Sequence, residues 1–185
     1  MDALIRQVLS ELETCVCQVS VESLVQALAL IESAPRIFVA GAGRSGLCMR
    51  ALGMRLMHLG NTVYVAGETT TPGIAANDLL ILGSGSGRTT NLLAMARKAR
   101  SCGARILLFT ADVTSPMEEL ADQVVLVSAP SLGMNEGERE QLSIQPMGTL
   151  FEQSLLILCD SLILGLMRQT GVSAAHMSGR HANLE

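Results

Sequence analysis

Residues 37–46 read Ile-Phe-Val-Ala-Gly-Ala-Gly-Arg-Ser-Gly, an apolar, partly β-branched run followed directly by a glycine-rich loop. A second stretch has the same arrangement, with Leu-Leu-Ile-Leu at residues 79–82 and Gly-Ser-Gly-Ser-Gly-Arg-Thr-Thr-Asn at residues 83–91. A helical pattern follows each loop. A strand, a glycine turn and a helix direct free backbone N–H groups and the positive end of the helix toward an anion. The two stretches therefore predict a site for a phosphorylated ligand.

The side chains of the two loops also suit a phosphate. The second loop offers three hydroxyl groups in a space that would hold one phosphate, and its glycines let the backbone curl and the ligand come close. The first loop adds an arginine that can hold the phosphate or a sugar oxygen. We expect the ligand to contact residues from both loops, namely Gly43, Arg44, Ser45, Ser84, Ser86, Gly87 and Thr89.

Strands and helices are expected to alternate along the chain. The predicted strands are 37–40, 62–65, 79–82, 105–109 and 123–127, and the predicted helices include two within 2–33, 45–59, 88–101 and 146–167. This alternation is typical of an α/β fold of three αβα layers around a parallel sheet. We expect five strands in the flavodoxin-like order 2-1-3-4-5, in which strands one and three are neighbours and ligands bind where their loops diverge.

Length and composition favour one domain spanning 1–185, with N-terminal helices over 1–34, a loop over 128–145 and a polar tail over 170–185. The chain has 185 residues, of which 49% are hydrophobic, enough for a full core.

Its net charge of −4 and the absence of a basic run argue against binding nucleic acid. Five cysteines, an odd number without zinc spacing, indicate reduced thiols in a cytoplasmic protein and no metal site.

The segment 150–167 is apolar enough to raise the question of a membrane span. It contains Glu152, Gln153 and Asp160. A charged residue at bilayer depth costs roughly 2.5–3.5 kcal/mol, so we expect a helix buried in the core or in a subunit interface, and no membrane association.

Residues 41–46 also fit the glycine pattern of dinucleotide-binding folds, Gly-x-Gly-x-x-Gly. That fingerprint requires an acid near the end of the second strand to hold a ribose. Glu68 stands at about the right distance but follows Gly67, in the predicted loop. The hydroxyl groups of the second loop suit a compact monophosphate better than a dinucleotide.

Four segments together resemble the sugar isomerase (SIS) domain family: 41–46, 83–89, 147–153 (Met-Gly-Thr-Leu-Phe-Glu-Gln) and 180–185 (Arg-His-Ala-Asn-Leu-Glu). The glycine loops indicate the domain alone. The last two segments narrow the resemblance to the branch that interconverts 3-hexulose 6-phosphate and fructose 6-phosphate. The resemblance covers the whole chain. It implies a place in the ribulose monophosphate route of formaldehyde fixation, no metal or organic cofactor, and a homotetramer.

Moving a carbonyl between neighbouring carbons requires a base that transfers a proton through an enediol, and Glu152 is the candidate. Positions three and four residues on are apolar, so Glu152 lies on an otherwise apolar helix face, where burial would raise its pKa toward neutrality. The alternative is an exposed acid in the opening turns of the helix, favourable to the helix dipole there.

His181 is the second catalytic candidate, for ring opening or for proton delivery to the carbonyl oxygen. Related SIS enzymes can take a histidine from a neighbouring subunit, which a C-terminal tail would suit. The alternative is a solvated tail histidine. His58, near the end of the predicted helix 45–59, is expected to serve the structure.

Two other functions remain open at this point. One is a different phosphosugar isomerase of the same fold, for example one acting on arabinose 5-phosphate. The other is a non-catalytic sugar-phosphate sensor, although the leading helices show no basic face for DNA. The apolar stripe on those helices, together with the apolar helix 150–167, predicts an oligomer, a tetramer or else a dimer.

Overall fold

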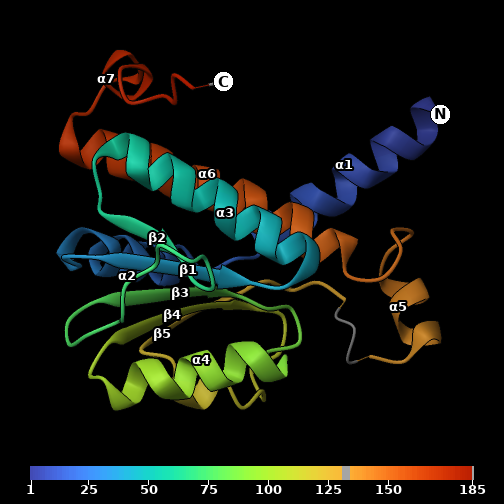
Figure 1. Ribbon diagram of the computed structural model, residues 1–185. Helices are drawn as coiled ribbons and strands as arrows, with labels where there is room; N and C mark the ends of the chain where they lie inside the picture. The colour runs from blue at the N-terminus through green and yellow to red at the C-terminus, as the bar shows by residue number, and fades with distance from the viewer. Residues whose placement is uncertain (131–133, 185) are drawn as a thin grey trace.

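The computed structural model describes residues 1–130 and 134–184, a parallel sheet with helices on both faces (Figure 1). The strands are β1 (Ile37–Gly41), β2 (Val63–Val65), β3 (Leu79–Gly83), β4 (Arg105–Thr110) and β5 (Gln123–Leu126). The helices are α1 (Asp2–Cys17), α2 (Val21–Ser33), α3 (Gly43–Leu59), α4 (Thr90–Ser101), α5 (Glu136–Leu142), α6 (Thr149–Thr170) and α7 (Ala174–Ser178), with a 3₁₀ turn at Glu118–Leu120.

The strand order is β2-β1-β3-β4-β5, and every neighbouring pair is parallel, as the sequence predicts. Gly41 at the end of β1 pairs in register with Gly83 at the end of β3. From there the chain enters α3 on one face of the sheet and α4 on the other (Figure 1). The two glycine loops therefore begin side by side and diverge, which makes this edge the place for a ligand.

Two apolar clusters hold the layers together, because successive strand residues point to opposite faces. On one face, Ile37, Val39 and Ile81 pack with residues of α2, α3 and α6. On the other, Phe38 and Leu80 pack with residues of α4 and the loop after β2. The expected three-layer arrangement is confirmed.

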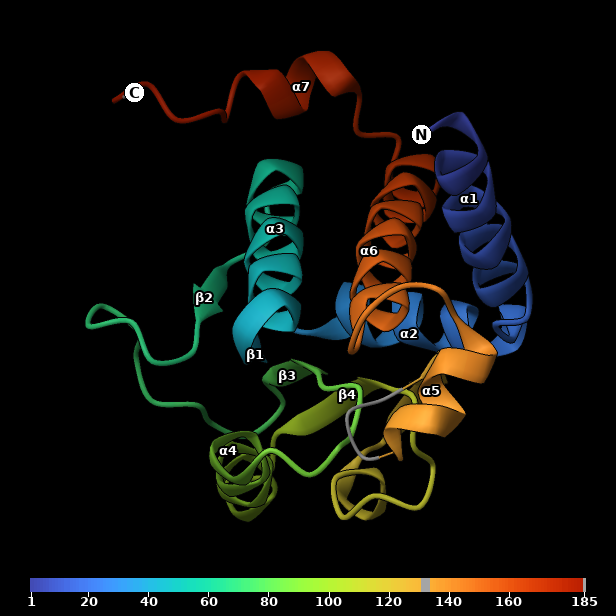
Figure 2. The ribbon, with the colours of Figure 1, turned by 90° about the vertical axis from the view of Figure 1, so that its right-hand side faces the viewer.

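The helix α6 meets the length and apolarity of a membrane span, yet it is a core element of this fold. Half of its most apolar 18-residue stretch is buried. Figure 2 shows α6 between α3 and α1, on the same side of the sheet. Nine of its residues, among them Phe151, Leu155 and Cys159, are buried. Packing against these two helices accounts for its buried apolar residues, whereas Leu156, Ile157 and Leu164 are exposed.

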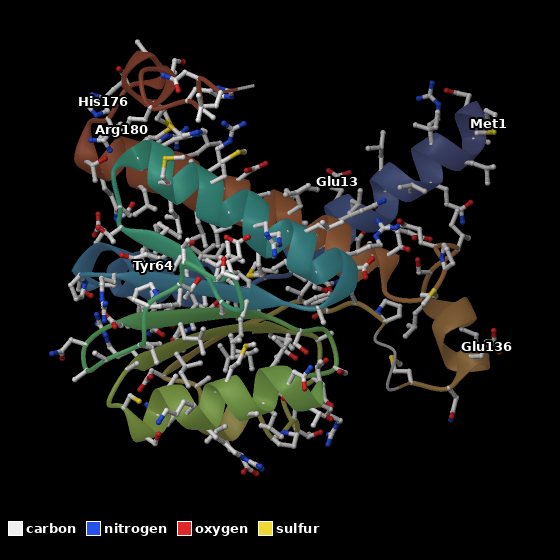
Figure 3. All side chains as sticks on the ribbon, viewed as in Figure 1. Met1, Glu13, Tyr64, Glu136, His176 and Arg180 are labelled. Carbon is white, nitrogen blue, oxygen red and sulfur yellow. The ribbon has the colours of Figure 1, made fainter. Side chains whose placement is uncertain are left out.

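The helix α1 is buried only toward its C-terminal end. Cys15 is buried in the core, while Leu4, Ile5 and Leu9 are each more than half exposed. Figure 3 shows α1 projecting from the body of the molecule, with Met1 at its far end. The predicted apolar stripe thus leaves an uncovered patch, defined by Leu4, Ile5 and Leu9.

Glu11 ties α1 to the segment before α6. Its carboxylate accepts hydrogen bonds from the Ser143 hydroxyl (2.6 Å), the Ile144 N–H (2.9 Å) and the Gln145 amide (3.0 Å). Partial burial alone would raise the pKa of Glu11, but these three bonds outweigh it and the pKa lies below its usual value. The contact fixes the approach of the chain to α6.

The structure differs from the expected elements in two regions. A short helix, α5, stands within the segment 128–145 that was expected to be a loop, and α7 stands within the tail. In α7 the Ser173 hydroxyl caps the helix by accepting from the His176 N–H, and Met177 is buried. Such short helices depend on caps and packing more than on periodicity. Residues 131–133 of the expected loop and Glu185 of the closing motif lie outside the described residues.

The start of α6 also differs from the prediction by three residues. The helix expected from Pro146 begins at Thr149, because the Pro146 carbonyl accepts from both the N–H and the hydroxyl of Thr149 and forms a turn first. The predicted cap of the second helix is confirmed, since the Ser20 hydroxyl accepts from the Ser23 N–H.

Candidate active site

A cavity of about 360 Å³ lies where β1 and β3 end, between the two glycine loops and the first turn of α6. Most of the residues proposed from the sequence line it together: Gly43, Arg44, Ser45, Ser84, Ser86, Thr89 and Glu152. The two glycine loops, which start 42 positions apart at Gly41 and Gly83, therefore share one site with the start of α6. That helix begins at Thr149, 60 residues after Thr89 of the second loop. This is the arrangement expected for a phosphate held by the loops and a sugar facing α6.

Glu152 is the acid in the wall of this cavity. Its Oε2 lies 2.8 Å from Nε of Arg44, and its side chain is 19% exposed against 57% for Arg44. Burial raises the pKa of Glu152, while the positive charge of Arg44 acts in the opposite direction. The result is a carboxyl group with a raised pKa, the property that suits a proton-transferring base near neutral pH.

The start of α6 is fixed against α3 and the second glycine loop. The Glu152 N–H donates to the Gly148 carbonyl at 3.0 Å, and the Glu152 carbonyl accepts from the Cys48 thiol at 3.3 Å. Phe151 is buried against Gly85, where an added Cβ would lie 3.2 Å from its ring. These contacts limit the movement of the Glu152 backbone.

Two glycine positions explain why the loops have their composition. A Cβ at Gly46 would lie 2.7 Å from the Gly41 carbonyl oxygen, so only glycine lets α3 start this close to β1. Gly87 has φ +59°, and a Cβ there would lie 2.1 Å from the Ser115 hydroxyl. Gly87, a predicted ligand contact, is not among the residues that line the cavity, and its conformation together with the nearby Ser115 requires glycine there.

Cavity residues beyond those proposed from the sequence come from segments without a chemical signature. Met147, Phe151 and Pro130 line the cavity. Met147 has φ +58°, a left-handed conformation that is costly for a side chain of this size. Strain of this kind is concentrated at binding sites, but the residue type alone gives no sign of it.

His181 lies at the other end of α3 from the cavity. Its ring stacks on that of His58, with the centroids 5.6 Å apart and the planes inclined by 27°. Because His58 follows Arg44 by 14 residues in α3, the stack lies about 21 Å from the cavity along the helix. Figure 3 likewise places His176 and Arg180 of the tail far from Glu136 of α5. A single chain does not bring His181 to its own Glu152.

His58 has the buried environment expected of a structural residue, with a relative exposure of 2%. Burial lowers its pKa, and the charges of Arg55 and His181 lower it further. The ring packs under the tail, against His181.

Glu68, the acid that a dinucleotide site would need, is engaged elsewhere. It forms an ion pair with Arg50 of α3. It does not line the cavity between the loops. Within residues 1–130 and 134–184, no group of three or more His, Cys, Asp and Glu side chains is arranged to hold a metal ion.

Known proteins resemble this chain in sequence and in fold. Residues 30–132 match the family model of the SIS domain. The chain is 47% identical to 3-hexulose-6-phosphate isomerase of Mycobacterium gastri, over 81% of this chain and 74% of that protein. The chain belongs to the SIS domain family.

Other relatives of this SIS domain protein extend the similarity to nearly the whole chain. It is 39% identical to 3-hexulose-6-phosphate isomerase of Bacillus subtilis, over 98% of this chain and 97% of that one. It also resembles the crystal structure of a hypothetical protein from Methanococcus jannaschii, for which a 3-hexulose-6-phosphate isomerase function is inferred. That similarity has a TM-score of 0.81 and 34% identity, covering 100% and 98% of the two chains.

Proposed function

We propose that this protein interconverts 3-hexulose 6-phosphate and fructose 6-phosphate. It is an SIS-family phosphosugar isomerase, and relatives of 39–47% identity carry the name of this activity. The observation that carries the proposal is the carboxylate of Glu152, which has a raised pKa in the wall of a cavity formed by two phosphate-type loops.

The phosphate would lie against the second loop and the N-terminal end of α4. Ser84, Ser86 and Thr89 provide hydroxyl groups there, and α4 begins at the next residue, Thr90. The free N–H groups of a helix start favour a dianion. With the phosphate in this place, the carbon chain of the sugar extends toward α6.

Glu152 would act on that carbon chain. Its carboxylate removes the proton from C2 of the 3-ketose, which leaves an enediolate between C2 and C3 with the negative charge on O3. The hydroxyl proton of O2 passes to O3, the carboxyl group returns its proton to C3, and the carbonyl is formed at C2. The guanidinium of Arg44, 2.8 Å from the carboxylate, is placed to stabilise the oxygen on which negative charge develops.

His181 would come from a neighbouring subunit of an oligomer. The patch of Leu4, Ile5 and Leu9 on α1, and the exposed Leu156 and Leu164 on α6, are apolar surfaces that a second copy would cover. We propose a homotetramer in the cytoplasm, where the free thiols of this chain would remain reduced. Its metabolic place would be the ribulose monophosphate pathway of formaldehyde fixation.

The test is formation of fructose 6-phosphate from 3-hexulose 6-phosphate by the purified protein, with arabinose 5-phosphate as a competing substrate. We expect turnover of the hexulose phosphate and little of the pentose phosphate. Turnover of arabinose 5-phosphate alone would assign the protein to a different isomerase. Binding of both sugars without conversion of either would make it a sensor.

A further inference from the structure

The segment after β4 supports the second glycine loop from behind. The backbone N–H of Ser84 donates to the Phe109 carbonyl, and that of Ala111 donates to the Gly85 carbonyl, both at 3.0 Å. The Thr110 hydroxyl also donates to Gly85, at 3.2 Å. The start of the phosphate loop is therefore bonded to the end of β4, and its conformation depends on the residues that follow β4.

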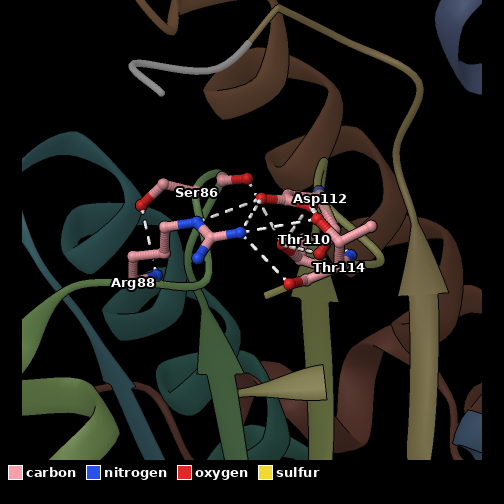
Figure 4. A network of polar contacts seen from close by, with 6 residues as sticks. Ser86, Arg88, Thr110, Asp112 and Thr114 are labelled. Carbon is pink, nitrogen blue, oxygen red and sulfur yellow. Dashed lines mark hydrogen bonds and ion pairs between the residues drawn. The ribbon is translucent and has the colours of Figure 1, made fainter. Parts of the chain in front are cut away.

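The later part of the loop is held by the side chain of Arg88. Its Nε and Nη2 lie 3.3 and 3.0 Å from Oδ2 of Asp112, and Nη2 also donates to the Thr114 carbonyl at 3.1 Å. The backbone N–H of Arg88 donates to the Ser86 hydroxyl at 3.3 Å. Figure 4 shows this network, with Arg88 directed toward the segment after β4.

Asp112 is itself held in place. Its Oδ1 accepts from both the N–H (2.8 Å) and the hydroxyl (2.7 Å) of Thr114, and its N–H donates to the Thr110 hydroxyl at 3.2 Å. These bonds, chiefly those from Thr114, hold the pKa of Asp112 below its usual value, so it stays charged. A charged, oriented carboxylate is a firm anchor for a guanidinium.

The position of Arg88 in the sequence connects its ion pair with Asp112 to the cavity. Arg88 lies between Ser86 and Thr89, which both line the cavity, yet Arg88 does not line it. We propose that Arg88 and Asp112 are positioning residues for the substrate phosphate, holding the loop in the shape in which Ser86 and Thr89 face the cavity. The proposal rests on the proposed function only in taking a phosphate as the group bound by this loop.

The test compares Arg88→Gln, Asp112→Asn and their double variant with Arg100→Gln. Arg100 is the matched control, because it forms a similar pair with Asp122 at the other end of α4, at 2.6 Å and with exposures of 45% and 30% against 50% and 26%. The readouts are the KM for the sugar phosphate, the dissociation constant of inorganic phosphate by calorimetry, kcat and Tm.

We expect each variant of the pair to raise both KM and the phosphate dissociation constant about three- to tenfold, the range for a partly exposed pair that also orders a loop. We expect kcat to stay within about twofold, the double variant to be no worse than the single ones, and Arg100→Gln to leave phosphate binding unchanged. Arg88→Lys keeps the positive charge but loses the contact of two guanidinium nitrogens with Asp112. Its KM and its phosphate dissociation constant should therefore lie between those of Arg88→Gln and those of the parent.

Three results would overturn the proposal. If Arg88 were itself a phosphate ligand, Asp112→Asn would release it and tighten phosphate binding. Equal weakening by Arg100→Gln would indicate a general loss of stability. A parent protein that binds no phosphate would remove the role altogether. Calorimetry needs no turnover, so weaker phosphate binding in a protein that does not isomerise 3-hexulose 6-phosphate would contradict the proposed function and leave the positioning role standing.

Discussion

Replacement of Glu152 by glutamine is the most direct test of the proposed chemistry. The amide keeps the size of the side chain and much of its hydrogen bonding, but it cannot accept the proton. General acid–base catalysis contributes typically 10²- to 10⁴-fold, which corresponds to about 2.7–5.5 kcal/mol in the barrier. We expect kcat to fall by that factor, with phosphate binding nearly unchanged.

The structure predicts that this substitution has only a small effect on stability, so a loss of activity can be distinguished from a loss of folding. Glu152→Gln breaks an ion pair whose partner, Arg44, is more than half exposed, and such pairs are worth at most about 1 kcal/mol. In a chain of this size that amount shifts Tm by about 2–4 °C. The uncharged amide also avoids the cost of burying a carboxylate, so the net shift should be smaller still.

Two assays together test whether Glu152 is the base. One is formation of fructose 6-phosphate, and the other is exchange of the carbon-bound hydrogen of the substrate with deuterated solvent, followed by NMR. Both should disappear together in Glu152→Gln and persist in Glu13→Gln, a control at an exposed position on α1. Exchange at the parent rate in Glu152→Gln would show that the base is elsewhere, and His181 would be tested next.

Three further predictions follow from the cavity and the exposed surfaces. Ser84→Ala with Ser86→Ala should raise KM strongly, because each bond lost to a charged group is worth about 1.5–3 kcal/mol; unchanged KM and unchanged inhibition by phosphate would contradict the assignment of the loop. Arg44→Met removes the charge that lowers the pKa of Glu152, so that pKa should rise and the acid limb of the kcat/KM profile should move to higher pH, whereas a downward shift would count against it. Leu4→Glu with Leu9→Glu should reduce the oligomer in sedimentation, and a parent that is monomeric at micromolar concentration would refute the proposed assembly.

The fold and the loop half of the site are predictable from the sequence because their signals are local. Apolar runs that end in glycine specify strand ends, and alternation with helices specifies a parallel sheet. The pairing of Gly41 with Gly83 then brings the two loops together without further information. The location of Glu152 at the cavity agrees with the prediction from its apolar helix face and the motif around it, and its role as the base stays a prediction.

The features that were not predictable depend on contacts between distant segments. Met147 has a left-handed backbone conformation just before α6, and Met177 of α7 is buried in the core. The place of His181 depends on where the tail packs, and in this chain that is on His58. The pair of Arg88 and Asp112 joins residues 24 positions apart whose types alone give no reason to link them.

Because β1 and β3 end in register, at Gly41 and Gly83, a change in the length of either strand would disturb this site. Parallel strands rise about 3.3 Å per residue and alternate their faces. Deleting one residue from β3 would thus draw the second loop back by about that distance and exchange the residues facing the two cores. Longer or shorter substrates are better accommodated at the exposed Met147, before α6, so related proteins that act on sugars of other lengths should differ at that position while the strands keep their length.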